Sequence, residues 1–131
     1  MAHLPTVPLR AAVLLGGAVG TALRLAVVAG VGASPWGTLV ANLTGAGALG
    51  YVVARAAGRP ATSPATALLT TGVLGAYTTF SALAVEILGL LDGASAAAVA
   101  YGLGSVALGL AAAAAGLVAG RRRAERARVT P

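Results

Sequence analysis

Hydroxyl side chains gather in the middle of a long apolar run, at residues 70–81. This stretch, T-T-G-V-L-G-A-Y-T-T-F-S, contains five threonine and serine residues and two glycines. Polar groups at membrane depth are costly, and they usually face a cavity or an ion pathway. Glycine weakens a helix by about 1 kcal/mol relative to alanine, and threonine hydroxyls can bond back to the backbone and bend it. The stretch therefore predicts a helix broken near its middle, whose freed carbonyls need a cation or a neighbouring helix.

Three polar side chains in the preceding apolar runs could serve the same site. Thr38 and Asn42 are four residues apart, so they share one face of a helix. An amide in hydrocarbon must find partners, so Asn42 either bonds a neighbouring helix or offers its N–H donors to an anion. Arg24 either snorkels to the interface or faces a partner or an anion route as a buried cation.

The composition indicates an integral all-α membrane protein that forms a single domain over residues 1–131. Of these residues 58% are hydrophobic and 9% are charged, whereas soluble domains carry about 25% charged residues. Without cysteine, disulfides and thiolate metal sites are excluded. The single histidine, His3, offers no nucleophile–base pair, so we do not expect an enzyme. Four transmembrane helices are expected at about 8–31, 37–56, 65–91 and 96–119.

Glycine spacing in these spans predicts close helix packing. Gly16 and Gly20 are four residues apart and form one small-residue face. Gly45, Gly47 and Gly50 match the dinucleotide-binding pattern G-x-G-x-x-G. That pattern needs a strand before it and an acidic residue about 20 positions later, and both are missing. We interpret these glycines as helix-packing residues as well.

The combined pattern resembles the Fluc (CrcB) family of fluoride channels, which are small four-helix membrane proteins. The motifs fall in three of the four spans, in the order and at the spacing of that family. The residues that carry the resemblance are Gly16, Gly17, Gly20, Arg24, Gly37, Thr38, Asn42, Gly45, Gly72, Gly75, Thr78, Thr79, Phe80, Ser81 and Glu86.

The resemblance implies an antiparallel, dual-topology dimer with two pores at its interface that export fluoride from the cytoplasm. It also implies a central structural sodium ion, held by the backbone carbonyls of Gly75 and Thr78. The expected fluoride pathway consists of Asn42, Phe80 and Ser81, with Thr38, Tyr101 and Ser105 nearby and Arg24 at the pore entrance.

Two residues depart from the family pattern. Leu83 stands where the family usually has a second phenylalanine, and Gly109 stands where it often has a second serine. These departures leave open an alternative function, a non-conducting structural subunit of a heterodimeric membrane complex. A proton-coupled small transporter is a further alternative. Its only candidate carboxylate is Glu86, towards the end of its span.

The arginines are distributed unevenly along the chain. With both termini on one side, that side holds Arg10, Arg55, Arg59 and five arginines of the tail 120–131, which we expect to fray. The other side has no basic residue. The positive-inside rule then predicts a single orientation with both termini cytoplasmic in the cell membrane. We therefore favour a heterodimer with an oppositely oriented paralogue over a homodimer. The basic cluster directly follows an apolar segment, so it indicates topology or lipid contact and not nucleic-acid binding.

Overall fold

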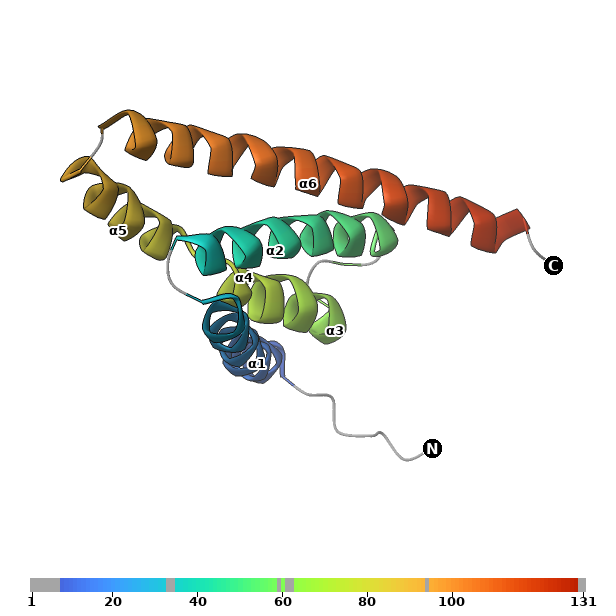
Figure 1. Ribbon diagram of the computed structural model, residues 1–131. Coiled ribbons are helices and arrows are strands. Elements are labelled where there is room, and N and C mark those ends of the chain that lie inside the picture. Colours follow the sequence, from blue (N-terminus) through green and yellow to red (C-terminus); the bar gives the residue numbers. More distant parts are fainter. Residues whose placement is uncertain (1–7, 33–34, 59, 61–62, 94, 130–131) are drawn as a thin grey trace.

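The computed structural model describes residues 8–32, 35–58, 60, 63–93 and 95–129. Within these residues every regular element is a helix (Figure 1). The elements are α1 (Leu9–Val31), α2 (Trp36–Arg55), α3 (Pro64–Ala67), the π-helical segment η1 (Leu68–Leu74), α4 (Gly75–Tyr77), α5 (Phe80–Leu91) and α6 (Ser95–Val129). Four stretches are long and apolar enough to cross a membrane: Leu9–Val31, Trp36–Arg55, Pro64–Leu91 and Ser95–Ala127. The predicted all-α fold with four transmembrane helices is confirmed.

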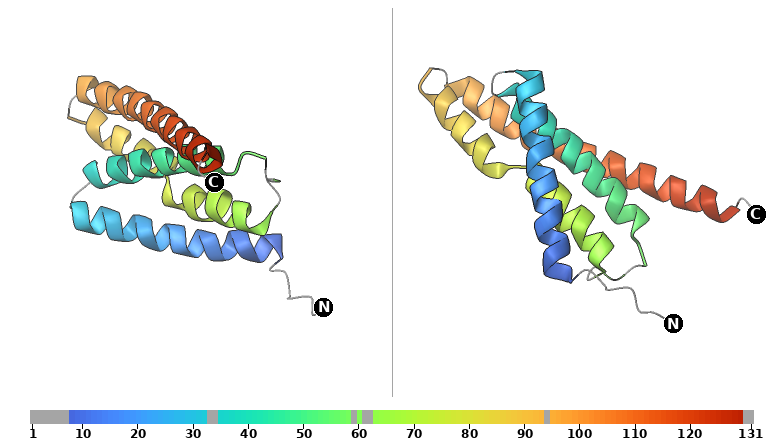
Figure 2. Two further views of the ribbon diagram at one scale, coloured as in Figure 1. Left: turned by 90° about the vertical axis from the view of Figure 1, so that its right-hand side faces the viewer. Right: turned by 90° about the horizontal axis from the view of Figure 1, so that it is seen from below.

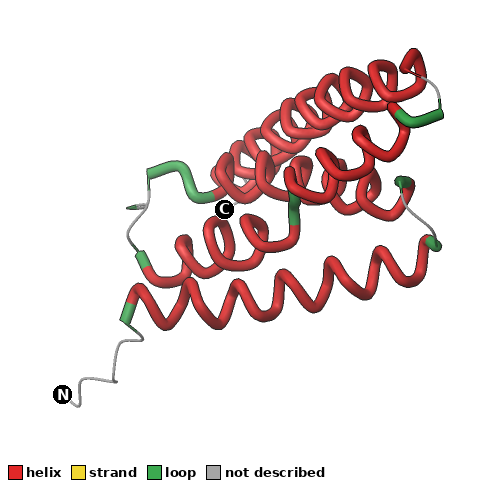
Figure 3. Tube along the Cα trace, turned by 90° about the vertical axis from the view of Figure 1, so that its left-hand side faces the viewer, coloured by secondary structure: helices red, strands yellow, loops and turns green. Residues whose placement is uncertain are grey.

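The third membrane-spanning stretch is broken, as predicted, and the break lies at Thr78 and Thr79. Both residues have extended backbone angles, with ψ of 154° at Thr78 and φ of −148° at Thr79. Figure 3 shows this break as a short non-helical stretch between α4 and α5. The two glycines that were expected to unwind the helix stay helical, Gly72 within η1 and Gly75 at the start of α4. The chain therefore opens at its threonines.

The helix α2 occupies the centre of the bundle. It packs along α6 on one side and against α1 on the other, while α1 also packs along η1 and α4 (Figure 2). Small residues make these contacts possible, as the glycine spacing predicted. A Cβ atom on Gly20 would meet the backbone carbonyl of Val73, and one on Gly116 would meet that of Gly47. In lipid, such close backbone approach is a main source of helix association.

Large apolar side chains point away from the bundle. Leu14 is 74% exposed and Leu103 is 69% exposed, whereas the buried apolar residues are mostly alanines. Such an arrangement would be unstable in water, but it suits a chain whose outer surface contacts lipid or another subunit. Together with the four apolar helices, it shows that the chain is a multi-pass membrane protein.

The predicted fraying of the tail is wrong for the described part of the tail. The helix α6 runs without interruption through the arginine-rich segment to Val129. Arginine, alanine and glutamate are good helix formers, and no glycine or proline interrupts residues 121–129. Arg121 and Glu125 are also spaced to support a helix at i,i+4. Residues 130 and 131 lie outside the described residues.

The first turn of α1, the last turn of α2 and the last turns of α6 lie at the same end of the bundle (Figure 2). Arg10, Arg55 and the arginines of α6 are therefore at one end. Asp92, just after α5, lies at the opposite end. Arg59, which the charge argument also counted, lies outside the described residues.

Candidate functional site

The break in the third span is fixed by the side chain of Asn42 on α2. The Asn42 Nδ2 atom donates to the carbonyl oxygen of Thr79 at 2.9 Å, and the Thr79 N–H donates to Asn42 Oδ1 at 2.8 Å. Asn42 therefore bonds a neighbouring helix, the first of the two alternatives that its sequence context left open. A side-chain amide carries two N–H groups, so one remains for a further acceptor.

These bonds change the partners of the Gly75 and Thr78 carbonyls. In a continuous helix, Thr79 N–H would donate to the Gly75 carbonyl and Ala82 N–H to the Thr78 carbonyl. Here Thr79 N–H donates to Asn42, and Ala82 N–H donates to the Thr79 hydroxyl at 3.3 Å. The two carbonyls that the family pattern assigns to a cation thus lose their normal helical donors at the break.

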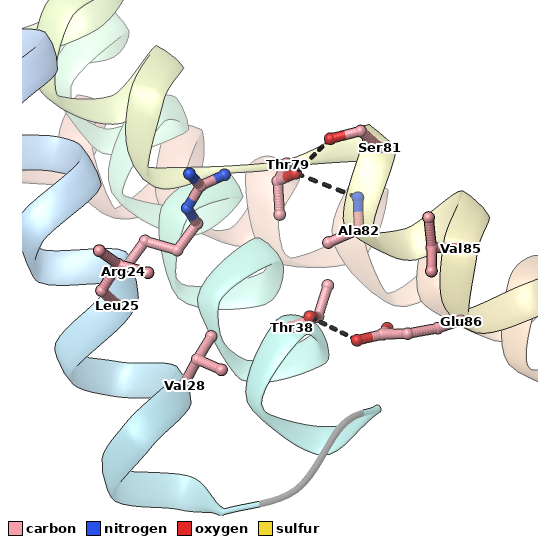
Figure 4. Close-up of a pocket in the computed structure, with 9 residues that line it drawn as sticks. All are labelled: Arg24, Leu25, Val28, Thr38, Thr79, Ser81, Ala82, Val85 and Glu86. Atoms are coloured by element: carbon pink, nitrogen blue, oxygen red, sulfur yellow. Dashed lines mark hydrogen bonds between the residues drawn. The ribbon is translucent and has the colours of Figure 1, made fainter.

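A first groove of about 460 Å³ lies on one side of the break, between α1, α2 and α5. Its polar side chains come from all three helices, and Figure 4 shows the Arg24 guanidinium directed towards the chain at Thr79. The half-buried Arg24 thus faces the break. The groove is lined by Arg24, Leu25, Val28, Thr38, Thr79, Ser81, Ala82, Val85 and Glu86.

Glu86 connects three helices at the edge of the first groove. Its Oε1 accepts a hydrogen bond from the Thr38 hydroxyl at 2.6 Å, and its Oε2 accepts one from the Tyr101 hydroxyl at 2.5 Å. Tyr101 also lies 3.1 Å from the carbonyl oxygen of Pro35. The hydroxyl hydrogens of Thr38 and Tyr101 are therefore directed to a carboxylate. An anion could use them only in competition with Glu86.

The sequence reasoning did not include Glu86 among the site residues. The spacing in the sequence does not predict its partners, because the two intervals differ. Thr38 and Asn42 are one turn apart on α2, and Thr79 and Glu86 are two turns apart on the third span. Two helices that run in opposite directions pair these positions as Asn42 with Thr79 and Thr38 with Glu86.

A second groove of about 380 Å³ lies on the other side of the break, between α2, α5 and α6. Asn42, Thr78, Thr79 and Phe80 line it near the break, and Phe80 is 78% exposed. Phe80 and Ser81, which the sequence analysis grouped together, lie along different grooves. Thr79 lines both grooves, so it forms the wall between them.

Leu83 and Ser105 form the buried part of the second groove. Leu83 is 6% exposed, and Gly109 lies along the same groove. Ser105 is 9% exposed, and its Oγ is buried without a hydrogen-bond partner among the described residues. An unpaired buried hydroxyl costs about 1–3 kcal/mol, so this position is suited to a polar ligand.

The structure thus brings together most of the predicted site residues, but not all in one place. Arg24, Thr38 and Ser81 line the first groove, while Asn42, Phe80 and Ser105 line the second. Tyr101 lies on a separate apolar groove together with Ser105. Gly75 lies on the outer surface of the chain, in a shallow hollow shared with Gly17 and Thr71.

Comparison with known sequences gives the family of this chain. A family model described as CrcB-like protein, Camphor Resistance (CrcB), matches residues 11–117. Relatives named fluoride-specific ion channel FluC come from Chelativorans sp. and Paracoccus denitrificans. The Chelativorans protein is 42% identical over 101 residues, which cover 72% of this chain and 81% of that protein. The Paracoccus protein is 46% identical over 114 residues, covering 83% and 91%.

A further relative, from Halobacterium salinarum, is named fluoride-specific ion channel FluC 2. It is 46% identical over 98 residues, covering 72% of this chain and 76% of that protein. The family match begins within the first apolar helix and ends within the fourth, and it includes the break and both grooves. The chain belongs to the Fluc (CrcB) family of fluoride-specific ion channels.

Proposed function

We propose that this chain is a subunit of a fluoride-specific channel that exports fluoride from the cytoplasm. The observation that carries the proposal is the break at Thr78 and Thr79, where two mainly apolar grooves, each with a few polar side chains, meet at a membrane-spanning helix. Arg24 faces the break from one side and Asn42 from the other. Irregular backbone at membrane depth is found where protein covers it or where it lines a cavity.

The donors along these grooves suit fluoride. Fluoride is small and strongly hydrated, so a pore must replace its water with good hydrogen-bond donors. The remaining N–H of Asn42, the hydroxyls of Ser81 and Ser105, and the positive edge of the Phe80 ring can serve this purpose. Arg24 offsets the repulsion that an apolar interior exerts on an anion. Thr38 and Tyr101 join the pathway when their bonds to Glu86 open.

We further propose a structural sodium ion held by the backbone carbonyls of Gly75 and Thr78. These carbonyls fit the ion because their usual helical donors are engaged elsewhere. Carbonyl oxygens are hard ligands and carry no titratable group. When bound, the ion would supply fixed positive charge near the anion route.

The position of Gly75 argues for a dimer. Its hollow on the outer surface, about 650 Å³, also contains Gly17, at which a Cβ atom would meet nothing within 4 Å. Two carbonyls from one chain cannot complete the coordination shell of a cation, and a second chain seated on this hollow would supply the rest. The exposed Phe80 ring would likewise be covered in such a dimer.

The charge distribution supports one orientation in the cell membrane, with both termini in the cytoplasm. Arg10, Arg55 and the α6 arginines lie at one end of the bundle, and Asp92 lies at the other. A chain with this bias inserts in one direction. An antiparallel dimer then requires a second, oppositely oriented paralogue. The Halobacterium relative is named FluC 2, and the number 2 in this name fits an organism that has more than one FluC protein.

Fluoride efflux from liposomes tests the function. This chain is reconstituted alone and then together with an oppositely oriented paralogue, and release is followed with a fluoride electrode. We expect efflux only from the mixed vesicles, with no matching release of chloride. Efflux from the chain alone would refute the obligate heterodimer but support the channel. No efflux in either sample would favour a non-conducting structural subunit, for which Leu83 and Gly109 in the second groove are the motivation.

Orientation is tested separately with reporters fused to the C-terminus in cells. A reporter that is active only in the cytoplasm should give a signal. A reporter that is active only on the other side of the membrane should give none. Equal activity of both reporters would show dual insertion and would remove the charge argument for a heterodimer.

A further inference from the structure

The end of α6 extends beyond the helix on which it packs. A Cβ atom on Gly120 would contact Ala54 and Tyr51, in the last turn of α2. Because α2 ends at Arg55, the segment 121–129 continues past its neighbour, and Figure 1 shows this end of α6 projecting from the bundle. Among the described helices, α6 packs against α2 and α5, and this segment lies beyond the end of α2.

The length of α6 places this segment outside the hydrocarbon layer. The helix has 35 residues, which at about 1.5 Å per residue gives roughly 50 Å. The hydrocarbon core of a bilayer is only about 30 Å thick. The apolar run that starts at Ser95 is long enough to cross it before Gly120 is reached. Residues 121–129 then lie at the level of the headgroups and beyond.

The segment is strongly basic. It contains five arginines and one glutamate, Glu125, and the side chains of Arg121, Arg122, Arg123 and Arg126 are exposed. Arg122 and Arg126 are four residues apart and share one face of the helix. A guanidinium group presents a planar fork of donors that matches phosphate oxygens.

We propose that residues 121–129 bind the headgroups of anionic phospholipids in the leaflet from which α6 emerges. The position supports a lipid over other phosphate compounds, because the arginines follow directly on a membrane-spanning helix, at the depth of lipid phosphates. Arg10 and Arg55 lie at the same end, but each is a single charge at a helix terminus. The paired arginines of α6 provide the local site. This proposal does not depend on fluoride conduction.

Lipid binding to the purified full-length chain in uncharged detergent micelles tests the proposal. Bound phosphatidylglycerol is counted by native mass spectrometry and compared with phosphatidylcholine at equal concentration. We expect a preference for phosphatidylglycerol, and R122Q/R126Q should weaken it about thirtyfold, or roughly fivefold for each arginine. R10Q/R55Q is the matched control, because it removes the same charge from the same end. Its binding should stay within about threefold of the wild type.

Three results of the lipid-binding comparison would overturn the proposal. The first is equal binding of phosphatidylglycerol and phosphatidylcholine. The second is an equal loss of phosphatidylglycerol binding in R122Q/R126Q and R10Q/R55Q. The third is displacement of the lipid by inorganic phosphate at a concentration similar to that of the lipid. A salt titration of the wild type covers the case in which R122Q/R126Q fails to fold. Binding should fall steeply towards 1 M salt, where charges are screened within about 3 Å. Salt-independent binding would also contradict the proposal.

Discussion

Asn42 and Thr79 bond each other twice, once through the Asn42 amide nitrogen and once through its oxygen. The side-chain amide takes the place of a peptide group at the point where the helix stops. The backbone N–H and carbonyl of Thr79 are thus both satisfied by one residue of α2, at a depth where water is scarce.

Replacing Asn42 with alanine should destabilise the protein by about 2–6 kcal/mol, since two backbone groups of Thr79 lose their partners. Thermal unfolding in detergent micelles measures the change. Thr70→Val is a suitable control, because the Thr70 hydroxyl donates to the Thr66 carbonyl, one turn earlier in the same membrane-spanning stretch. If Asn42→Ala loses no more stability than the control, the two hydrogen bonds between Asn42 and Thr79 are not important for stability.

Thr38→Val and Tyr101→Phe should each cost about 1.5–3 kcal/mol, because each removes a hydrogen bond to the Glu86 carboxylate. The two donors hold different oxygens of one group, so their effects should be coupled by about 0.5–3 kcal/mol. A double-mutant cycle of unfolding free energies measures this coupling. Strict additivity would mean that Glu86 does not link the two helices.

Gly20→Ala should destabilise the helix packing by about 1–3 kcal/mol, since the new Cβ atom would overlap the Val73 carbonyl. Gly30→Ala provides the matched control on the same helix, because a Cβ atom there meets nothing within 4 Å. Its stability should remain unchanged or rise. Thermal unfolding of both variants is the measurement, and a similar loss in both would contradict close packing at Gly20.

Ser105→Ala should separate stability from transport. The Ser105 hydroxyl is buried without a partner among the described residues, so its removal should leave the unfolding free energy unchanged or raise it by about 1 kcal/mol. If the hydroxyl contacts fluoride, efflux should fall about tenfold, the effect of losing one bond to a charged group. Both quantities are measured on the same preparation. Unchanged efflux would remove Ser105 from the proposed pathway.

Leu83→Phe should raise fluoride efflux about two- to tenfold in a conducting dimer, because a ring beside Phe80 adds a positive edge to the second groove. The substitution enlarges a buried side chain, so a stability loss of about 1–3 kcal/mol is also expected. Leu83→Met, which keeps the volume, is the control for repacking. If the efflux of Leu83→Phe equals that of the control, the side chain at 83 is not part of a working pore.

Hydropathy and small-residue spacing were sufficient to predict the four helices and the glycine contacts, because both depend on residues close in sequence. The existence of the break also followed from its threonines and glycines. Its exact position within residues 70–81 did not, since Gly72 and Gly75 keep helical angles and the chain opens at Thr78 and Thr79. The bond from Asn42 arrives from a residue 37 positions away and places the break at Thr79. Local propensity contains no information on such a partner.

The site was predicted as a set of residues, but not as two grooves. Phe80 and Ser81 are adjacent in sequence, yet at the start of α5 they point to different sides. The role of Glu86 depends on donors from two other helices. The end of α6 was misjudged for a different reason. Its charge suggested a loose tail, although its residues are good helix formers.

The bond between Asn42 and the Thr79 backbone also has a consequence for biosynthesis. Chains are made and inserted from the N-terminus, so α2 is complete before the third span leaves the ribosome. The Asn42 side chain, which bonds the backbone at the break, is therefore synthesised before Thr79. The open backbone of the third span can therefore be satisfied as soon as that span is inserted next to α2.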